Sequence, residues 1–172
     1  GWQKGRFEMY LSSVNMAGFK GKQLLYENNL SVSLVDIDSL WVRSFKDKRL
    51  PENKRYIPMP QERLDSLELG LNIKRAILRT GEVTHIQIAK NGVVPGKIYF
   101  SDLSARATNI TNGYGDQKEA KTTRLTALGK LMGDGQMSAT FEFNNKEPNN
   151  YFEGHASLGE FDARTLNNYL TH

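Results

Sequence analysis

Cysteine is absent from the 172-residue sequence. Its absence excludes disulfide bridges, thiolate metal ligands and cysteine nucleophiles, and it leaves the redox compartment undetermined. No run of residues approaches the roughly 20 consecutive apolar residues that a membrane-spanning helix requires. The first residues, GWQKGRFEMY, are typical neither of a signal peptide nor of a start at an initiator methionine. We therefore expect the chain to be a fragment of a larger protein, with any anchor or targeting signal upstream.

A strong excess of charge of one sign is also missing. Lysine and arginine number 23 against 19 for aspartate and glutamate, which gives a net charge of +4 and a pI near 9.2. Because there is no sustained basic stripe, we expect no nucleic-acid partner. The content of 38% hydrophobic and 24% charged residues is typical of an ordinary globular chain. We expect a single β-rich domain over residues 1–172.

Apolar and polar residues alternate along most of the chain, which is the pattern of half-buried β-strands. The longest example is GKIYFSDLSARATNITN, residues 96–112. Ile98 and Phe100 share one face of this extended segment, whereas Leu103 and Ala105 have the opposite parity. The switch predicts a β-bulge between Phe100 and Leu103.

The sequence predicts a mainly β fold, with a long antiparallel meander sheet that is curled or forms a partly open barrel or groove. Asn28-Asn29 and Thr80-Gly81 are expected to form hairpin turns, because asparagine and glycine tolerate positive φ angles. A second parity switch, between Leu34 and Ile37, predicts another bend. The expected strands cover residues 6–13, 22–27, 30–45, 72–79, 82–90, 96–111, 120–132, 135–144 and 151–160.

Two short helices are expected, near residues 60–69 and 162–170. Pro60 suits the first turn of the earlier helix, and Gly70 suits its end. In the later helix Asp162 is a good N-cap, and Phe161 and Leu166 occupy the positions of a hydrophobic staple. A helix that follows the last strand could cover one end of a curled sheet.

The titratable residues form no catalytic or metal-binding motif. His85 and His155 lie on the polar parity of expected strands, and His172 is terminal, so we interpret all three as solvated. Asp36 and Asp38 share one face of a strand, which could serve a hydrolase or a calcium ion, but no further ligand accompanies them. We expect no catalytic residue, no metal and no cofactor.

A basic segment, RSFKDKRLPENKRYIP, lies between the third expected strand, 30–45, and the first expected helix. One interpretation is a site for anionic head groups or phosphates. The other is a solvated loop, which is the more common role of charge clusters around proline and asparagine. The candidate head-group contacts are Lys46, Lys48, Arg49, Lys54 and Arg55.

Two longer segments resemble a known family. The first is IPMPQERLDSLELGLNIKRAILRTGEVTHIQIAKNGVVPGKIYFSDLSARATNITN, and the second runs from GQMSATFEF to YFEGHASLGEFDARTLNNYL. Over roughly residues 56–170 their order of short helix, hairpin, Pro-Gly entry and closing Phe-Asp and Leu-Asn segments is similar to AsmA-like envelope proteins of Gram-negative bacteria.

The resemblance implies a periplasmic module of a protein anchored in the inner membrane. Such a module would serve outer-membrane biogenesis or lipid transport, and its partners would be a phospholipid or other lipid and the neighbouring repeats of the full-length chain. An apolar β-groove would shelter the lipid, with Ile98, Phe100, Met137, Phe141 and Phe143 as the candidate contacts.

The same alternation fits other functions. A closed sandwich or barrel would use these apolar residues as an ordinary core, in which Phe7 would also be buried. A β-sandwich interaction or carbohydrate-binding module would present aromatic residues, such as Trp2 or Trp41, on its polar face. Tyr10 and Tyr99 have the polar parity for that role. An enzyme is the least favoured reading, because no constellation of reactive groups supports it.

Overall fold

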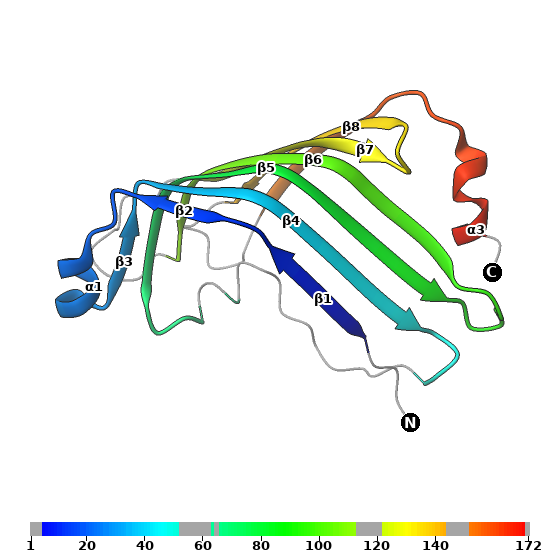
Figure 1. Cartoon of the computed structure of the whole chain (residues 1–172), viewed down its shortest axis with the longest axis horizontal. Helices are drawn as coiled ribbons and strands as arrows, with labels where there is room; N and C mark the ends of the chain where they lie inside the picture. The colour runs from blue at the N-terminus through cyan, green and yellow to red at the C-terminus, as the bar shows by residue number, and fades with distance from the viewer. Residues whose placement is uncertain (1–4, 52–62, 64–65, 113–121, 144–151, 171–172) are drawn as a thin grey trace.

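The protein is mainly β and forms one sheet of nine strands with short helices, as expected (Figure 1). The structure, a computed structural model, describes residues 5–51, 63, 66–112, 122–143 and 152–170. Half of the expected helix over 60–69, namely 60–62, 64 and 65, lies outside these residues, and residues 66–69 form a turn and a bend that lead into β5 and no helix. The described strands are β1 (Arg6–Leu11), β2 (Val14–Ala17), β3 (Asn29–Val32), β4 (Leu34–Asp47), β5 (Gly70–Ile88), β6 (Gly96–Thr111), β7 (Thr123–Leu131), β8 (Gly135–Phe143) and β9 (Phe152–Leu158).

The sheet is open, and its strands are ordered β1-β4-β5-β6-β7-β8-β9. β1 and β2 follow each other along one side of β4 with a single register, and β3 lies beside β5. β1 and β2 therefore form one edge of the described sheet, and β9 forms the other. Figure 1 shows the strands arching over a concave side, so the sheet is curled without closing into a barrel.

The sheet is mixed and not the purely antiparallel meander that the sequence predicts, because β4 and β5 run parallel. Their register is constant from Val35 opposite Ala76 to Asp47 opposite Ile88. β3 is also parallel to β5. Parallel neighbours need a long crossover connection, and 22 residues separate the end of β4 at Asp47 from the start of β5 at Gly70. The remaining pairs from β5 to β9 are antiparallel, as expected.

The expected hairpin at Thr80-Gly81 is also wrong, since β5 runs through both residues without a turn. β5 is flanked by β4 and β6 along its length, so two long ladders hold it extended. Gly81 marks a close approach instead. A Cβ atom there would lie 3.1 Å from the backbone oxygen of Leu40 and 3.2 Å from Cδ2 of Leu78.

The expected strand over 22–27 is a helix, α1 (Gly21–Glu27). Asn28 does adopt a positive φ, of 49°, but it ends this helix in the left-handed conformation and does not form a hairpin turn. Its N–H donates to the backbone oxygen of Gln23. The expectation that Asn28 adopts a positive φ is confirmed. That backbone conformation occurs at helix ends as well as in hairpin turns, so it does not distinguish between them.

A line of irregular residues crosses four strands near the middle of the sheet, and we call it the crest. Between β6 and β7 the register shifts from Ser101 to Ser104, which confirms the expected bulge, and Asp102 has a φ of 50°. The crest comprises residues 12–13 between β1 and β2, 38–39 in β4, 79–82 in β5 and 101–104 in β6.

Side-chain alternation inverts at the crest. Paired residues of a ladder share a face, so Ile37 lies on the same side as Leu78, and Leu40 on the same side as Gly81. The Cβ position of Gly81 points at Leu78 and Leu103, which places all of these residues on one side. The switch expected between Leu34 and Ile37 therefore occurs between Ile37 and Leu40.

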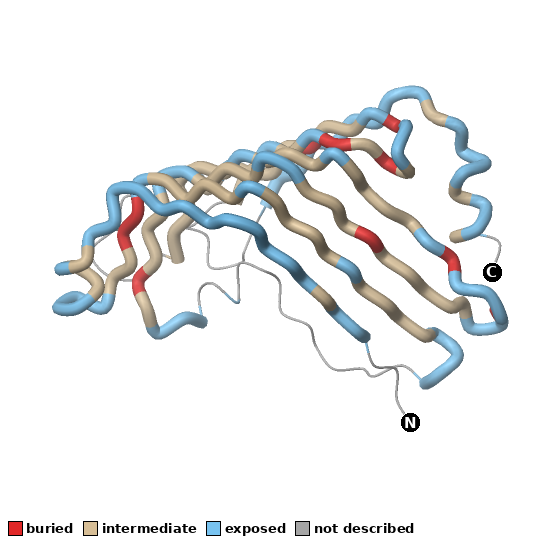
Figure 2. Tube along the Cα trace, viewed as in Figure 1, coloured by how far each residue is buried: buried red, intermediate tan, exposed pale blue. Residues whose placement is uncertain are grey.

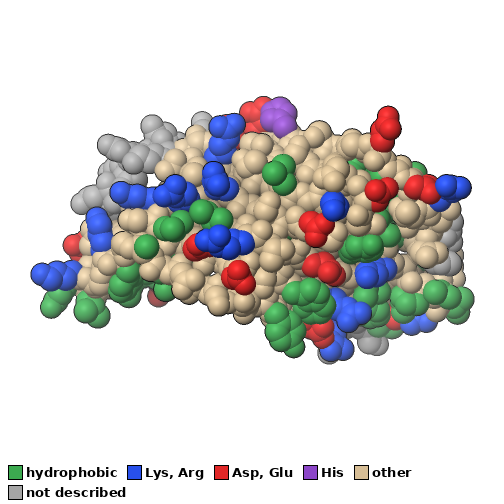
Figure 3. Space-filling view, turned by 45° about the horizontal axis from the view of Figure 1, so that its top comes forward, with side chains coloured by type: hydrophobic (Ala, Val, Ile, Leu, Met, Phe, Trp, Pro, Cys, Tyr) green, Lys and Arg blue, Asp and Glu red, His purple; other side chains and the backbone are tan. Residues whose placement is uncertain are grey.

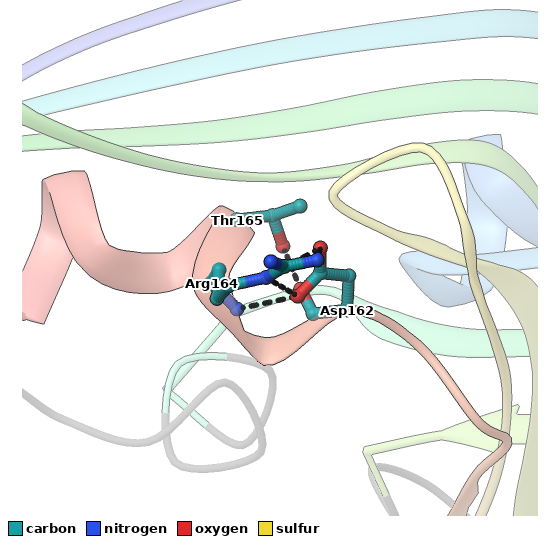
Figure 4. Close-up of polar contacts among 3 residues, drawn as sticks. All are labelled: Asp162, Arg164 and Thr165. Atoms are coloured by element: carbon teal, nitrogen blue, oxygen red, sulfur yellow. Dashed lines mark hydrogen bonds and ion pairs between the residues drawn. The ribbon is translucent and has the colours of Figure 1, made fainter.

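The carboxyl-terminal helix is confirmed as a 3-10 turn, η1 (Ala163–Leu166), followed by α3 (Asn167–Leu170). The Asp162 carboxylate caps it by accepting from the Arg164 N–H at 3.0 Å (Figure 4). The Arg164 guanidinium donates to the same carboxylate at 2.8 Å, and this hydrogen bond lowers the pKa of Asp162. The Thr165 hydroxyl donates to the Asp162 backbone oxygen at 2.7 Å. α3 is thereby held beside Gly96 of β6, where a Cβ atom would lie 2.5 Å from the Asn168 oxygen.

The described residues contain very little fully buried core. The buried hydrophobic side chains are Val32, Leu131 and Ala139, which are 3%, 8% and 8% exposed. Figure 2 shows these and the other buried positions as short, separated segments along otherwise half-exposed strands. Phe7 is 65% exposed, so its expected core position is wrong. The described sheet is a single layer held mainly by its ladders.

Because Asp102 has a positive φ, the stability of the fold should depend on which residue occupies position 102. Replacing Asp102 by valine should destabilise the fold by about 1–2 kcal/mol more than replacing it by asparagine, because a β-branched residue is strained at positive φ. Both changes remove the carboxylate, so the difference between them isolates the backbone. Denaturant melts measure it. Thr108→Val, at a regularly paired position of β6 outside the crest, serves as the control, and equal melts for the two Asp102 variants would contradict the prediction.

Candidate functional site

The concave side of the sheet carries a continuous apolar surface, which we call the inner face. Ladder partners share a face, so the rows of paired residues define it across all the strands. One such row joins Met9, Val42, Val83, Phe100 and Leu131. The larger apolar side chains of the inner face are Phe7, Met9, Leu11, Ile37, Leu40, Val42, Leu78, Val83, Ile98, Phe100, Leu103, Leu125, Leu131, Met137, Phe141, Phe143, Phe152 and Leu158.

All five candidate lipid contacts lie on the inner face. Phe100 pairs with Leu131, and Met137 pairs with Gly129, two residues before Leu131 on the same side of β7. Phe141 and Phe143 follow Met137 at even spacing on β8, and Ile98 precedes Phe100 on β6. Each of the five is half-buried. The structure therefore brings together residues that the sequence places on strands far apart in the chain.

The inner face is most exposed near the sheet edges. Met9 on β1 is 54% exposed, and Phe152 on β9 is 43% exposed. Aromatic contacts continue to the β9 edge, where the ring centroids of Phe143 and Phe152 are 5.9 Å apart. Contiguous apolar surface of this extent on a folded protein commonly marks a binding surface.

One end of the inner face carries polar side chains, and these are grouped around His85. The Nδ1 atom of His85 lies 2.8 Å from the Ser44 hydroxyl oxygen, and its ring meets the edge of Tyr169 on α3 at a centroid distance of 6.1 Å. Burial lowers the pKa of His85, the positive charges of Lys48 and Lys46 lower it further, and a hydrogen bond with Gln87 opposes them.

The solvated interpretation of His85 is therefore wrong. His85 has the polar parity when the alternation is counted from the amino-terminal half of β5, but the crest inverts that alternation before position 85. His155 does fit the prediction, because it is exposed on β9 with Nε2 3.0 Å from the Glu153 carboxylate. His172 lies outside the described residues.

The three described candidate head-group contacts lie in two different settings. Lys46 is half-buried on the inner face in the ladder row of Gln87 and Gly96, close to the His85 end. Lys48 and Arg49 follow in an exposed turn. The Arg49 guanidinium donates to Asp47 at 2.7 Å, and this hydrogen bond lowers the pKa of Asp47. Lys54 and Arg55 lie outside the described residues.

The opposite, convex side of the sheet is the outer face, and it is polar (Figure 3). Cross-strand ion pairs lie along it. Asp102 and Lys130 approach to 2.9 Å, and Arg124 lies 3.2 Å from Glu142. These pairs are solvent-exposed and contribute little to stability individually. Their exposure shows that the described residues place no second protein layer over these pairs.

Asp36 and Asp38 each have a different hydrogen-bond partner in the structure. The Arg79 guanidinium donates two hydrogen bonds, of 3.0 and 2.6 Å, to the two carboxylate oxygens of Asp36. Asp38 accepts from the Ser12 hydroxyl at 3.4 Å. Within the described ranges, no group of three or more histidine and carboxylate side chains could hold a metal ion.

Three clefts open on the outer face. One, of about 400 Å³, lies between Arg6, Arg43 and Ile86, and one of about 530 Å³ lies around Ile77 and Arg106. The third, of about 510 Å³, lies at the crest beside Tyr10 and Trp41. The sequence placed Tyr10 on the polar parity but gave no means of pairing it with Trp41, since the contact depends on β1 docking against β4. The alternation of β4 itself, once inverted at the crest, is the signal that places Trp41 on this face.

No known family model matches the chain, and no curated protein matches it. Among the helices in the described part of the chain, none has the length and apolar character to cross a membrane. The geometry of the two faces is accordingly the basis for the functional argument.

Replacing Phe141 by asparagine distinguishes an open inner face from a closed core. Because Phe141 is half-exposed, we expect a loss of about 1–2 kcal/mol in the free energy of unfolding, against about 3–5 kcal/mol for Leu131→Asn at a buried position. Denaturant melts of the two variants provide the comparison. Equal, severe losses would show that Phe141 is packed as a core residue.

The lowered pKa of His85 predicts a stability that depends on pH. The folded state holds the neutral imidazole, so the contribution is present above the ordinary pKa of 6.5 and is lost as the pH falls from there toward the lower folded value. Urea melts at pH 7.5 and pH 5 should show a larger acid-induced loss for the parent than for His85→Gln. His155→Gln, at an exposed position, should behave like the parent. An unchanged pH dependence in His85→Gln would contradict the prediction.

Proposed function

We propose that the protein is a non-enzymatic module that binds a lipid through its inner face. The observation that carries this proposal is the apolar inner face itself, which runs from the β1 edge to the β9 edge and is only half-buried along its length. Leaving such a surface in water has a cost of about 25 cal/mol for each Å² of apolar area. An acyl chain is the ligand that removes this cost without needing hydrogen-bond partners on the protein.

The dimensions of the inner face suit an acyl chain. β6 alone has 16 residues. At about 3.3 Å per residue, an extended strand of that length spans roughly 50 Å, which exceeds the roughly 30 Å of a whole bilayer hydrocarbon core. The side chains at its centre are small or flexible, including Ala105 and Ala107 on β6 and Met137 on β8. Such residues leave room for a ligand to lie along the strands.

The polar end of the inner face supplies a site for the lipid head group. Lys46 and Lys48 lie close enough to His85 for their charges to lower its pKa, and the Ser44 hydroxyl is adjacent. A positively charged end beside an apolar surface matches an amphiphile whose head group is anionic. In this arrangement the acyl chains lie against Phe100 and its neighbours, and the head group lies beneath α3.

The resemblance to AsmA-like envelope proteins supports the setting that we propose for this module. The module would lie in the periplasm, tethered to the inner membrane by another part of a longer chain, and would act in lipid transport or outer-membrane biogenesis. Its edges suit such a chain, because β1 and β9 each have one unpaired side within the described sheet. Neighbouring repeats could add strands there and continue the inner face.

Lipid binding can be tested with two adjacent residues that point to opposite faces. Met9 and Tyr10 are both exposed on β1, but Met9 lies on the inner face and Tyr10 on the outer face. We expect Met9→Asp to weaken binding of a fluorescent fatty acid about tenfold, since one side chain of this size contributes about 1.5 kcal/mol or more when it is covered. Tyr10→Asp should bind like the parent.

The measurement is a fluorescence titration, repeated with phosphatidylglycerol and phosphatidylcholine as competitors. Stronger competition by the anionic lipid, reduced in Lys46→Gln, would support the head-group site. Absence of binding by the parent protein, or equal weakening by the Met9 and Tyr10 variants, would refute the inner face as a lipid site.

A further inference from the structure

The crest cleft on the outer face is a second candidate site, separate from the inner face. It has a volume of about 510 Å³, within the range of small-ligand sites. Residues of β1, β4, β5 and β6 line it, together with residues between β1 and β2. The lining combines two aromatic rings with several hydroxyl groups and two carboxylates.

The bend of the sheet explains why a cleft forms there. Side chains converge on the concave side of a bend. At Gly81 the side chains of Leu78 and Leu103 come so close that a Cβ atom would lie 3.2 Å from Leu78 and 3.5 Å from Leu103. On the convex side the side chains diverge. The residues at the line of divergence are small, including Ser39 and Thr80, so they do not fill the space that opens.

Tyr10 and Trp41 form an aromatic wall of the cleft. They are ladder partners on β1 and β4, with ring centroids 5.7 Å apart and a tilt of 54° between the ring planes. Tyr10 is 69% exposed, so one ring face remains open to a ligand. Trp41 is half-buried beside it, so the pair presents an aromatic surface that is partly accessible from the outer face.

The polar lining offers both donors and acceptors. Hydroxyl groups of Ser12, Ser39 and Ser101 can act in either role, and the carboxylates accept. Glu82 is oriented by the Thr84 hydroxyl, which donates to it at 3.0 Å, and Thr84 is itself buried. The second carboxylate, Asp102, is paired with Lys130 at 2.9 Å.

From these observations we propose that the crest cleft binds a neutral pyranose oligosaccharide. A sugar ring has an apolar C–H face that can stack on Tyr10 or Trp41 and a rim of hydroxyl groups that both donate and accept. Among the described residues that line this cleft there are two carboxylates and no lysine or arginine, which disfavours an anionic ligand. The numerous hydroxyl groups disfavour a purely apolar ligand.

A titration of tryptophan fluorescence tests this proposal. The sequence has two tryptophans, so Trp2→Phe leaves Trp41 as the single reporter. The probes are cellohexaose, maltohexaose and chitohexaose, with choline chloride as the cationic comparison. We expect at least one hexasaccharide to shift the Trp41 emission saturably, and choline to leave it unchanged.

Three variants locate the site. Tyr10→Ala, at an exposed position that should not disturb folding, should weaken binding about tenfold, as truncation of an aromatic anchor commonly does. Glu82→Gln should weaken it by removing a charged acceptor, and both variants can be measured by isothermal calorimetry. Met9→Ala, adjacent on β1 but on the inner face, should bind the hexasaccharide like the parent.

Several results would overturn the proposal. These are the absence of binding for every hexasaccharide at millimolar concentration, binding that Tyr10→Ala leaves unchanged, or a response to choline alone. The lipid proposal is independent of each, because it depends on Met9 and the inner face, while the saccharide site depends on Tyr10 and the outer face.

Discussion

The coordinated bend at the crest is the constraint on which the rest of the structure depends. In an extended strand, a shift of one residue in the apolar pattern would move all the following apolar side chains to the opposite face of the sheet. Here β4, β5 and β6 each change parity within the same line, from Ile37 to Leu40, from Leu78 to Gly81 and from Phe100 to Leu103. Because the changes coincide, the ladder pairing resumes unchanged between β4 and β5, and between β5 and β6, beyond the crest. The inner face therefore stays apolar across the crest while the sheet turns over, and it becomes polar only at the end around His85.

The same bend gives the two faces different chemistry. On the concave side, large side chains such as Leu78 and Leu103 meet over Gly81, and the apolar surface is continuous. On the convex side, small hydroxyl residues leave an open cleft beside Tyr10 and Trp41. A single sheet can in this way carry an amphiphile on one side and a polar ligand on the other, with only the thickness of the backbone between them. The residues of β1 alternate between the two sites, and single substitutions there separate them.

The described fold depends more on backbone pairing than on a packed core. Three hydrophobic side chains of the described residues are buried, while β4, β5 and β6 contribute 14, 19 and 16 residues to continuous ladders. Long central strands paired on both sides satisfy their backbone groups without a second layer. The exposed apolar surface is the consequence, and it is a stable arrangement only where a ligand, a neighbouring repeat or another part of the chain shares its burial. The binding role that we propose for the inner face would meet that requirement.

The sequence by itself determined the features that depend on neighbouring residues. Alternation predicted the bounds of β6, β7 and β8 closely, the bulge after Phe100 and the common side of the five candidate lipid contacts, and Asp162 predicted the terminal helix. Tertiary structure decided the parallel pairing of β4 with β5, the passage of β5 through Thr80-Gly81 and the inner position of His85. It also decided the contact of Tyr10 with Trp41. The physical reason is that side-chain parity is a local property of an extended chain, whereas strand partners and the inversion of parity at a shared bend depend on residues far apart in the sequence.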